Sequence, residues 1–392
     1  MRVRRSRAWR DRQGKILVMT VLMTPVLFGA ALVSTDTAIL VNAEAQLKTA
    51  ADAAALSGAM VLADETRLRG TTSLASLMST ARSKVISVAS SNQVLNSPTL
   101  IADNPKNATS GDVIIGYLSA TDYTSPTPAT TGSQALFNSV KVVAWRDASH
   151  GGQIPTFFGG PLGIGAKNLS VSSTAQAQNF AIKGFQSVGG GNVSLLPIVL
   201  DKTTYDAMMN RTTADQYFYC PSPAAVSAGS DGVPESQIYP VGSGNPGNWG
   251  TIKIGVSNNS TATLVSQIQY GITPAQLATF PNSKIQLDST LNPPSITFGG
   301  NPGLSAGIQS ALTAMIGKTA YVGIYDQSSG NGNNTTYRAV NFAAIRVMAV
   351  NFQGNPKYVV IQPALVRDQS VIAGSAQANW TNGGLIKVHL AR

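Results

Sequence analysis

The pattern of apolar and polar residues divides the chain near residue 70. Residues 16–33 form an uncharged apolar run, and residues 35–69 follow without a proline and are rich in Ala and Leu. A helix of eighteen residues, at 1.5 Å per residue, is close to the length that crosses the hydrocarbon core of a bilayer. We expect a transmembrane helix from Ile16 to Val33, with Pro25 tolerated in its middle, that continues as an exported Ala-rich helix over residues 34–70.

The exported helix has one face of small side chains. Projected at 100° per residue, this face carries Ala43, Leu47, Ala50, Ala51, Ala54, Gly58 and Val61, and the adjoining face carries Glu44, Lys48 and Asp52. Small side chains let another element approach closely. The helix therefore packs either on its own domain, as a docked stalk, or on a neighbouring molecule. The residues predicted at this interface are Leu47, Ala51, Asp52, Ala54 and Gly58.

Beyond residue 70, strand patterns outnumber helical ones. Helices are expected at residues 74–90, 263–269 and 304–316, and alternating runs rich in Val, Thr and Ser predict strands at residues 112–118, 139–146, 169–180, 195–200, 251–256, 320–325, 339–352, 358–365 and 385–390. The fold class is α+β. We predict a basic tail (1–15), a membrane helix (16–33), a stalk helix (34–70), a first β-rich part (71–183), a Gly-rich linker (184–193) and a second β-rich part (194–392).

The positive charge of the chain is concentrated at its N-terminus. Of the formal net charge of +10, +6 falls within residues 1–15, which include Arg4, Arg5, Arg7, Arg10, Arg12 and Lys15. Cationic residues beside a membrane helix are held on the cytoplasmic side, so the bulk of the chain is expected outside the cytoplasm. No later stretch alternates cations with aromatic residues, which argues against nucleic acid as a partner. A cleaved signal peptide, with a peptidase site near Gly29 to Ala31, is the alternative to a retained anchor.

The sequence offers little material for a catalytic or metal site. The chain has two histidines, His150 and His389, and the single cysteine Cys220. His150 is expected in a solvated turn and Cys220 in a packing role. Motifs of metalloproteases, serine hydrolases and thiol oxidoreductases are missing, and the D-x-S-x-S metal motif fails at Asp326 because Gly330 stands in its last position. We expect no enzyme, no cofactor and no bound metal.

The junction between the apolar run and the stalk helix resembles a known family. An Arg-rich start, Gly14, the apolar run with Pro25, Asp36 and the segment AEAQLKTAADAAALSGA over residues 43–59 are similar to the N-terminal membrane-helix module of TadE/TadG-like proteins of the Tad (tight adherence), or Flp, pilus assembly system. Residues 139–178, with NSVKVVAWR, PTFFGGPLGI and LSVSSTAQAQ, resemble the family's next block.

This resemblance implies an inner-membrane, TadG-like protein with a large periplasmic part. Such a protein assists the assembly or anchoring of adhesive pili without catalysis, and its partners are the inner membrane and other Tad/Flp assembly proteins. The small-residue face of the stalk helix leaves self-association as a further, open alternative. Pilin-like proteins of the same system are cut after a Gly with Glu at the fifth mature position. Cleavage after Gly14 would place Met19 there, which argues against such processing.

Two other functions remain as alternatives. An anchored or secreted carbohydrate-binding, adhesive β-domain could use Trp249 and Trp380, because both lie in turn-rich segments and aromatic rings stack on sugar faces. An anchored hydrolase is disfavoured by the shortage of His, Cys and paired carboxylates.

Overall fold

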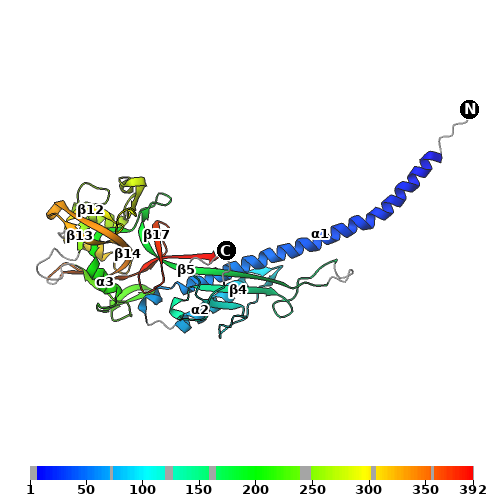
Figure 1. Ribbon diagram of the computed structural model, residues 1–392, viewed down its shortest axis with the longest axis horizontal. Coiled ribbons are helices and arrows are strands. Elements are labelled where there is room, and N and C mark those ends of the chain that lie inside the picture. The colour runs from blue at the N-terminus through cyan, green and yellow to red at the C-terminus, as the bar shows by residue number, and fades with distance from the viewer. Residues whose placement is uncertain are drawn as a thin grey trace, which may run out of the picture.

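The computed structural model describes residues 7–70, 74–119, 127–158, 165–238, 249–301, 306–354 and 357–391. Its dominant element is helix α1 (Arg7–Leu62), which runs for 56 residues, or about 84 Å. Figure 1 shows the N-terminal half of α1 projecting from the β-rich body and its C-terminal half lying along that body. The expected α+β class, with a long apolar N-terminal helix followed by a mostly β region, is confirmed.

The described elements follow a simple order along the chain. The helices after α1 are α2 (Leu74–Ser91), α3 (Lys202–Met209), α4 (Thr261–Tyr270), α5 (Pro274–Leu277) and α6 (Gln309–Thr313), with 3-10 turns η1 (Glu65–Arg69), η2 (Gln134–Leu136), η4 (Pro281–Ser283), η5 (Ala306–Ile308) and η6 (Gly332–Asn334). The strands are β1 (Gln93–Val94), β2 (Ser97–Pro98), β3 (Val113–Gly116), β4 (Ser139–Arg146), β5 (Leu169–Gln186), β6 (Leu195–Asp201), β7 (Tyr217–Pro221), β8 (Ala224–Ala228), β9 (Ser236–Ile238), β10 (Trp249–Ile252), β11 (Lys284–Gln286), β12 (Ile296–Asn301), β13 (Thr319–Ser329), β14 (Thr335–Asn351), β15 (Tyr358–Pro363), β16 (Leu365–Val366), β17 (Val371–Gln377) and β18 (Gly384–Ala391).

The first part of the body is an antiparallel sheet covered on one face by α1 and α2. Strand β4 pairs with β3 and β5, and β5 pairs on its other side with β18. The small face of α1 meets this sheet, and the apolar side chains of α2 pack in the same core, which contains Ala43, Leu47, Ala51, Ala54, Ala59, Ala81, Val85, Val113, Val140 and Ala175. Alanine on α1 brings the helix backbone close to the strands, as the sequence pattern predicts.

The second part of the body extends the same sheet. Its strands follow in the order β12-β10-β6-β13-β14, and β14 joins β5 at Phe342 opposite Ile182. One face of this part packs against α3, α4 and α6, and the other face forms an aromatic core around Phe185, Phe298, Tyr337 and Phe342. The 18-residue strand β5 therefore belongs to both parts, and one continuous sheet connects the two cores.

The structure corrects three of the predicted boundaries. The helix ends at Leu62 rather than near residue 70, because Asp64 caps η1 by accepting the Thr66 N–H at 2.8 Å. The predicted linker is wrong at residues 184–186, which are paired with β11 and β17 as the end of β5. Gly184 is needed there because a Cβ would lie 2.2 Å from the carbonyl oxygen of Ile285. The C-terminal strand β18 returns to the first part, so the second part does not extend unbroken to residue 392.

Gly58 gives a test of how closely α1 is packed. A Cβ at this position would lie 2.6 Å from Cγ2 of Val85 and 3.2 Å from Cγ1 of Val140. We expect Gly58→Ala to lower the free energy of unfolding by about 1–2 kcal/mol, because overpacking outweighs the gain in helix propensity. Urea unfolding of the full chain in detergent measures the change. The control is Gly29→Ala on the same helix, where nothing lies within 4 Å of the added Cβ; a Gly58→Ala protein as stable as this control would contradict the close packing.

Candidate functional site

The projecting half of α1 presents an apolar surface to its surroundings. The helix is long and apolar enough to cross a membrane, and none of its most apolar window is buried inside the chain. The large exposed side chains are Ile16, Leu17, Val18, Met19, Val21, Leu22, Met23, Val26, Leu27, Phe28 and Val33. Polar hydroxyls in this stretch are satisfied within the helix: Thr20 donates to the Ile16 carbonyl at 2.9 Å and Thr24 to the Thr20 carbonyl at 2.7 Å. Such a surface suits lipid better than water.

The residues predicted to set the anchor and its topology lie on or before this half of α1. Pro25 lies inside the continuous helix, between Ile16 and Val33. Figure 1 shows α1 curving along its projecting half, as expected for a helix with an internal proline. Lys15 is exposed, and Arg7, Arg10 and Arg12 belong to the first turns of α1, whereas Arg4 and Arg5 lie outside the described residues.

The predicted interface face of α1 is docked on the chain's own sheet. Leu47, Ala51 and Ala54 are completely buried. Asp52 accepts a hydrogen bond from the Ser173 hydroxyl at 2.6 Å and pairs with Lys48 at 2.8 Å, and Lys48 also donates to the Ser172 carbonyl. Together with Gly58, these residues lie against β4, β5 and α2. Of the two alternatives, the structure shows the docked stalk helix.

The C-terminal end of α1 is held by a group of four arginines, Arg67, Arg211, Arg346 and Arg367, which we call the arginine collar. Arg67 is the most buried and donates to the carbonyl oxygens of Leu62 at 3.0 Å, Phe137 at 2.7 Å and Ala135 at 2.6 Å. Its guanidinium lies 4.2 Å from the centre of the Trp380 ring, which supplies a cation–π contact. Burial lowers the pKa of Arg67 to about 10, so it remains charged at neutral pH.

Two further collar residues come from the second part of the body. Arg367 donates to the Met60 carbonyl at 3.0 Å, in the last turn of α1. Arg211 donates to the carbonyls of Leu68 at 2.9 Å and Arg69 at 2.7 Å. The last carbonyls of a helix have no partner within the helix and carry partial negative charge. Arg367 therefore satisfies a carbonyl at the end of α1, and Arg211 ties η1, the turn that follows α1, to the second part.

The fourth collar residue forms the ion pair of this junction. Arg346, on β14, pairs with Glu65 of η1 at 2.6 Å, donates to the Gly317 carbonyl and lies 3.5 Å from the centre of the Tyr219 ring. Burial raises the pKa of Glu65 above its usual range, against the lowering effect of Arg346. Glu65 also accepts the Leu365 N–H at 3.3 Å, so one carboxylate connects η1 to two strands of the second part.

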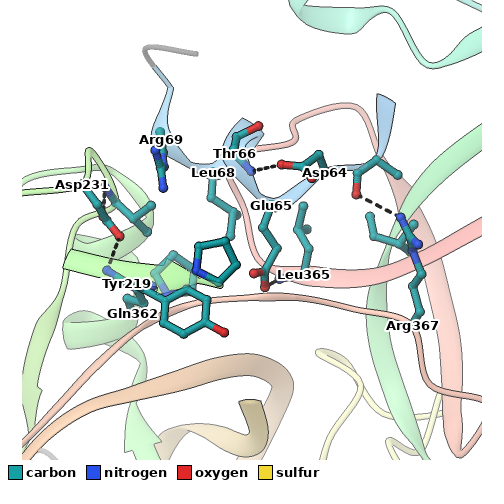
Figure 2. Close-up of a pocket in the computed structure, with 15 residues that line it drawn as sticks. Asp64, Glu65, Thr66, Leu68, Arg69, Tyr219, Asp231, Gln362, Leu365 and Arg367 are labelled. Atoms are coloured by element: carbon teal, nitrogen blue, oxygen red, sulfur yellow. Dashed lines mark hydrogen bonds between the residues drawn. The ribbon is translucent and has the colours of Figure 1, made fainter. Parts of the chain in front are cut away.

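A cavity of about 260 Å³ lies beside the collar. Its walls come from η1, the β7–β8 hairpin and the β15–β16 segment, and Figure 2 shows Glu65 reaching from η1 toward the Tyr219 ring. Several of the polar groups that line it are engaged: Asp231 accepts the Tyr219 N–H, Asp64 the Thr66 N–H, and Arg367 donates to the end of α1. The buried Oε1 of Gln362, in contrast, has no hydrogen-bond partner among the described residues. The cavity is a gap at a structural junction, and its carboxylates hold backbone groups.

The other residues singled out by the sequence have structural partners. His150 lies in the expected turn but is not freely solvated, because it contacts Asp147 at 2.8 Å and Asp112 at 3.4 Å; its hydrogen bond lowers the pKa of Asp147. Asp326 pairs with Arg338, through Oδ1 and Nε at 2.8 Å. Within the part of the chain that the structure describes, no three His, Cys, Asp or Glu side chains gather as a metal site.

Trp380, one of the two tryptophans of the carbohydrate-binding alternative, does not form an open platform. Trp380 is only 5% exposed and stacks beneath Arg67, and the side chain of Trp249 lies outside the described residues. Cys220 lies on β7 and its Sγ contacts the Ser222 carbonyl at 3.3 Å. This placement gives Trp380 a packing role, whereas Cys220 is half-buried and its packing role stays a prediction.

The arginine collar was not anticipated from the sequence. Its members are far apart in the chain and share no spacing, so a pattern of residues cannot reveal them. One compositional feature of the sequence could have indicated charged groups at the end of α1. Only 12% of the chain is charged, yet the charged segment ETRLR follows directly on the Ala-rich stretch. Charged residues just beyond a helix in such a chain are candidates for capping the helix end.

Three carboxylates organise the chain beside the collar. Glu235 accepts the N–H of Gln216 at 2.6 Å and of Tyr217 at 3.0 Å. Asp215 and Asp231 accept further backbone N–H groups in the same segment. Burial raises the pKa of Glu235 to about 7, against the lowering effect of its two N–H donors. The segment between β8 and β9 therefore contains a carboxyl group, that of Glu235, whose pKa lies near neutrality.

Removing one partner of the collar ion pair should destabilise the protein. We expect Arg346→Ala to cost about 2 kcal/mol of unfolding free energy, because it leaves the partly buried Glu65 unpaired and removes the Tyr219 contact. Urea unfolding in detergent measures it. The control Lys202→Ala removes an exposed pair with Asp206, worth less than about 0.5 kcal/mol. If both variants lose the same stability, Arg346 does not hold the junction.

Glu235 predicts a pH dependence of stability. The folded protein keeps a proton on Glu235 up to about pH 7, whereas the unfolded chain releases it near the ordinary pKa of about 4.5. Because the folded state binds more protons in this window, the contribution of Glu235 to stability falls as the pH rises from about 4.5 to about 7. Unfolding curves of wild type and Glu235→Gln across this range should diverge accordingly. The exposed carboxylate variant Glu44→Gln serves as control, and parallel curves for wild type and Glu235→Gln would contradict the assignment.

Comparison with known proteins places this architecture in context. A family model described as putative Flp pilus-assembly TadE/G-like matches residues 14–61. No curated protein and no solved structure matches the chain. The matched segment coincides with almost the whole of α1, both the exposed apolar half and the docked half, and it supports a pilus-associated role. Residues 14–61 thus form a TadE/G-like segment of the Flp pilus-assembly kind, as the run over residues 43–59 led us to expect.

Proposed function

We propose that this protein is a membrane-anchored, non-enzymatic component that assists the assembly or envelope anchoring of Tad/Flp pili. The observation that carries the proposal is that the TadE/G-like match falls on α1, which is at once the apolar anchor and a main element of the first core. In this arrangement the N-terminal tail with its arginines lies in the cytoplasm, α1 crosses the inner membrane, and the β-rich body lies in the periplasm.

The absence of a role in catalysis is part of the proposal. His150 and the carboxylates near the cavity act as structural groups, because their hydrogen bonds are made to backbone and to one another. A protein of this kind works by presenting a rigid body at a fixed distance from the membrane. Its partners are the inner membrane and other Tad/Flp assembly proteins that meet the body or the projecting helix.

Deletion and complementation test this function. We expect deletion of the gene to abolish surface pili and adhesion, and wild type to restore both. Leu27→Arg, in the exposed part of α1, should fail to restore them, because an arginine at the centre of the span costs about 2.5–3.5 kcal/mol of insertion free energy. Electron microscopy of pili and an adhesion assay give the readouts.

Two controls make the result specific. Leu27→Ile keeps the span apolar and should restore piliation fully. An impermeant maleimide applied to spheroplasts should label Tyr270→Cys in a Cys220→Ser background, because Tyr270 is 69% exposed on the β-rich body. Unchanged piliation and adhesion in the deletion strain would show that the assigned role is wrong.

A further inference from the structure

A pair of exposed phenylalanines lies next to the end of the apolar span. Phe157 is 71% exposed and Phe158 is 36% exposed, with ring centres 6.5 Å apart. They belong to the connection between β4 and β5, which Figure 1 shows extending along α1 toward its projecting half. Adjacent exposed aromatic rings on a protein surface are unfavourable in water and indicate a contact with an apolar or interfacial partner.

The position of these rings along α1 is fixed by one carboxylate. Asp36 accepts the Phe157 N–H at 2.8 Å and the Phe158 N–H at 3.1 Å. Further along, Lys48 of α1 contacts Ser172 and Asp52 contacts Ser173. The connection therefore runs back along the helix from the level of residue 52 to that of residue 36, a distance of about 24 Å at 1.5 Å per residue.

The two ends of this connection are also hydrogen-bonded to each other. Ile154 and Lys167 exchange both backbone hydrogen bonds at 2.9 Å, and Gln153 donates to Asn168 at 2.8 Å. The Thr156 hydroxyl donates to the Gly165 carbonyl at 3.4 Å. These contacts hold the segment as a narrow ribbon, so the Phe pair lies at a defined level along the axis of α1.

The level of the Phe pair along the axis of α1 matches the headgroup region of the bilayer. Asp36 follows Val33, the last residue of the apolar run, by three positions, which is about 4.5 Å along the helix axis. The headgroup region on each side of the hydrocarbon core is about 5–8 Å thick. Trp and Tyr concentrate at this level in membrane proteins, and Phe is among the residues that insert at the headgroup–acyl boundary from interfacial segments.

We propose that Phe157 and Phe158 form a second membrane contact, inserting into the headgroup region of the leaflet from which α1 emerges, with Asp36 holding them at that level. The inference rests on the proposed membrane anchoring by α1 and adds a second attachment point to it. With two contacts, the body cannot rotate freely about the helix axis relative to the membrane. The occupant is the lipid surface, because the rings lie within one headgroup layer of the predicted end of the span.

The test first measures the depth of the connection in a bilayer with both phenylalanines in place. The full chain with Cys220→Ser and Ala166→Cys carries a nitroxide at position 166, which is exposed and adjoins Gly165, the partner of Thr156. The protein is reconstituted into vesicles of phosphatidylethanolamine and phosphatidylglycerol. Collision rates of the nitroxide with oxygen, which partitions into lipid, and with a water-soluble nickel chelate are compared.

We expect the oxygen-to-nickel ratio at position 166 to be at least about fivefold higher than at Tyr270→Cys, an exposed site on the distal body. Replacing both phenylalanines by serine should bring the ratio down to that of Tyr270→Cys. Asp36→Ala should lower it as well, whereas Glu44→Ala, which removes an exposed carboxylate of the same helix, should not.

The outcomes separate this inference from the anchoring itself. A water-like ratio at position 166, together with a lipid-like ratio for a nitroxide at Leu27→Cys, overturns the second contact and leaves the anchor intact; the rings would then be available for a protein partner. A water-like ratio at Leu27→Cys overturns the anchor and the second contact together. A high ratio at position 166 that survives the double serine substitution also overturns the assignment to the phenylalanines.

Discussion

The structure depends on the close packing of one face of α1 against the β4–β5–β18 sheet. The helix is continuous but has two different environments along its length, and each environment favours a different kind of side chain. Large apolar residues face outward where the helix projects, and alanines face the strands where it docks. Because the backbone is continuous from Arg7 to Leu62, the direction in which the helix leaves the body is set by this packing rather than by a hinge. A bulky residue on the docked face would therefore disturb more than local stability.

The end of α1 poses a second physical problem, because its last carbonyls point into the protein rather than into water. Two residues of the arginine collar solve it: Arg67 of η1 donates to the Leu62 carbonyl, and Arg367, just after β16, donates to the Met60 carbonyl. Arg211 and Arg346 hold the adjoining η1. Long guanidinium side chains can reach carbonyls from several directions and still pack against aromatic rings, as Arg67 does on Trp380 and Arg346 on Tyr219. The collar also joins the two cores, since Arg346 and Arg367 belong to the second part, whereas Glu65 and Met60, which accept from them, belong to the first.

Local patterns in the sequence predicted much of this architecture. The apolar run and the alanine-rich stretch fix α1, and alternation identifies β4, β13, β14 and β18, because these signals come from neighbouring residues. The predicted boundaries that were wrong depend on contacts between residues that are distant in the sequence. Gly184 looks like part of a linker, yet it lies inside β5 because the backbone of β11 approaches too closely for a side chain. The pair of Arg346 with Glu65 and the contact of Asp36 with Phe157 join residues more than 100 positions apart, and no local pattern encodes such pairs.

The length of β5 has a mechanical consequence. This strand pairs with β4 over eight residues and with β18 over seven, and at its far end with β11 and β17. It lies along the docked half of α1 and reaches the distal core. A force applied between that core and the projecting end of α1 would load these strand pairs lengthwise. In that direction the hydrogen bonds of a ladder share the load and must break together, so the protein should resist pulling along its long axis more strongly than across it.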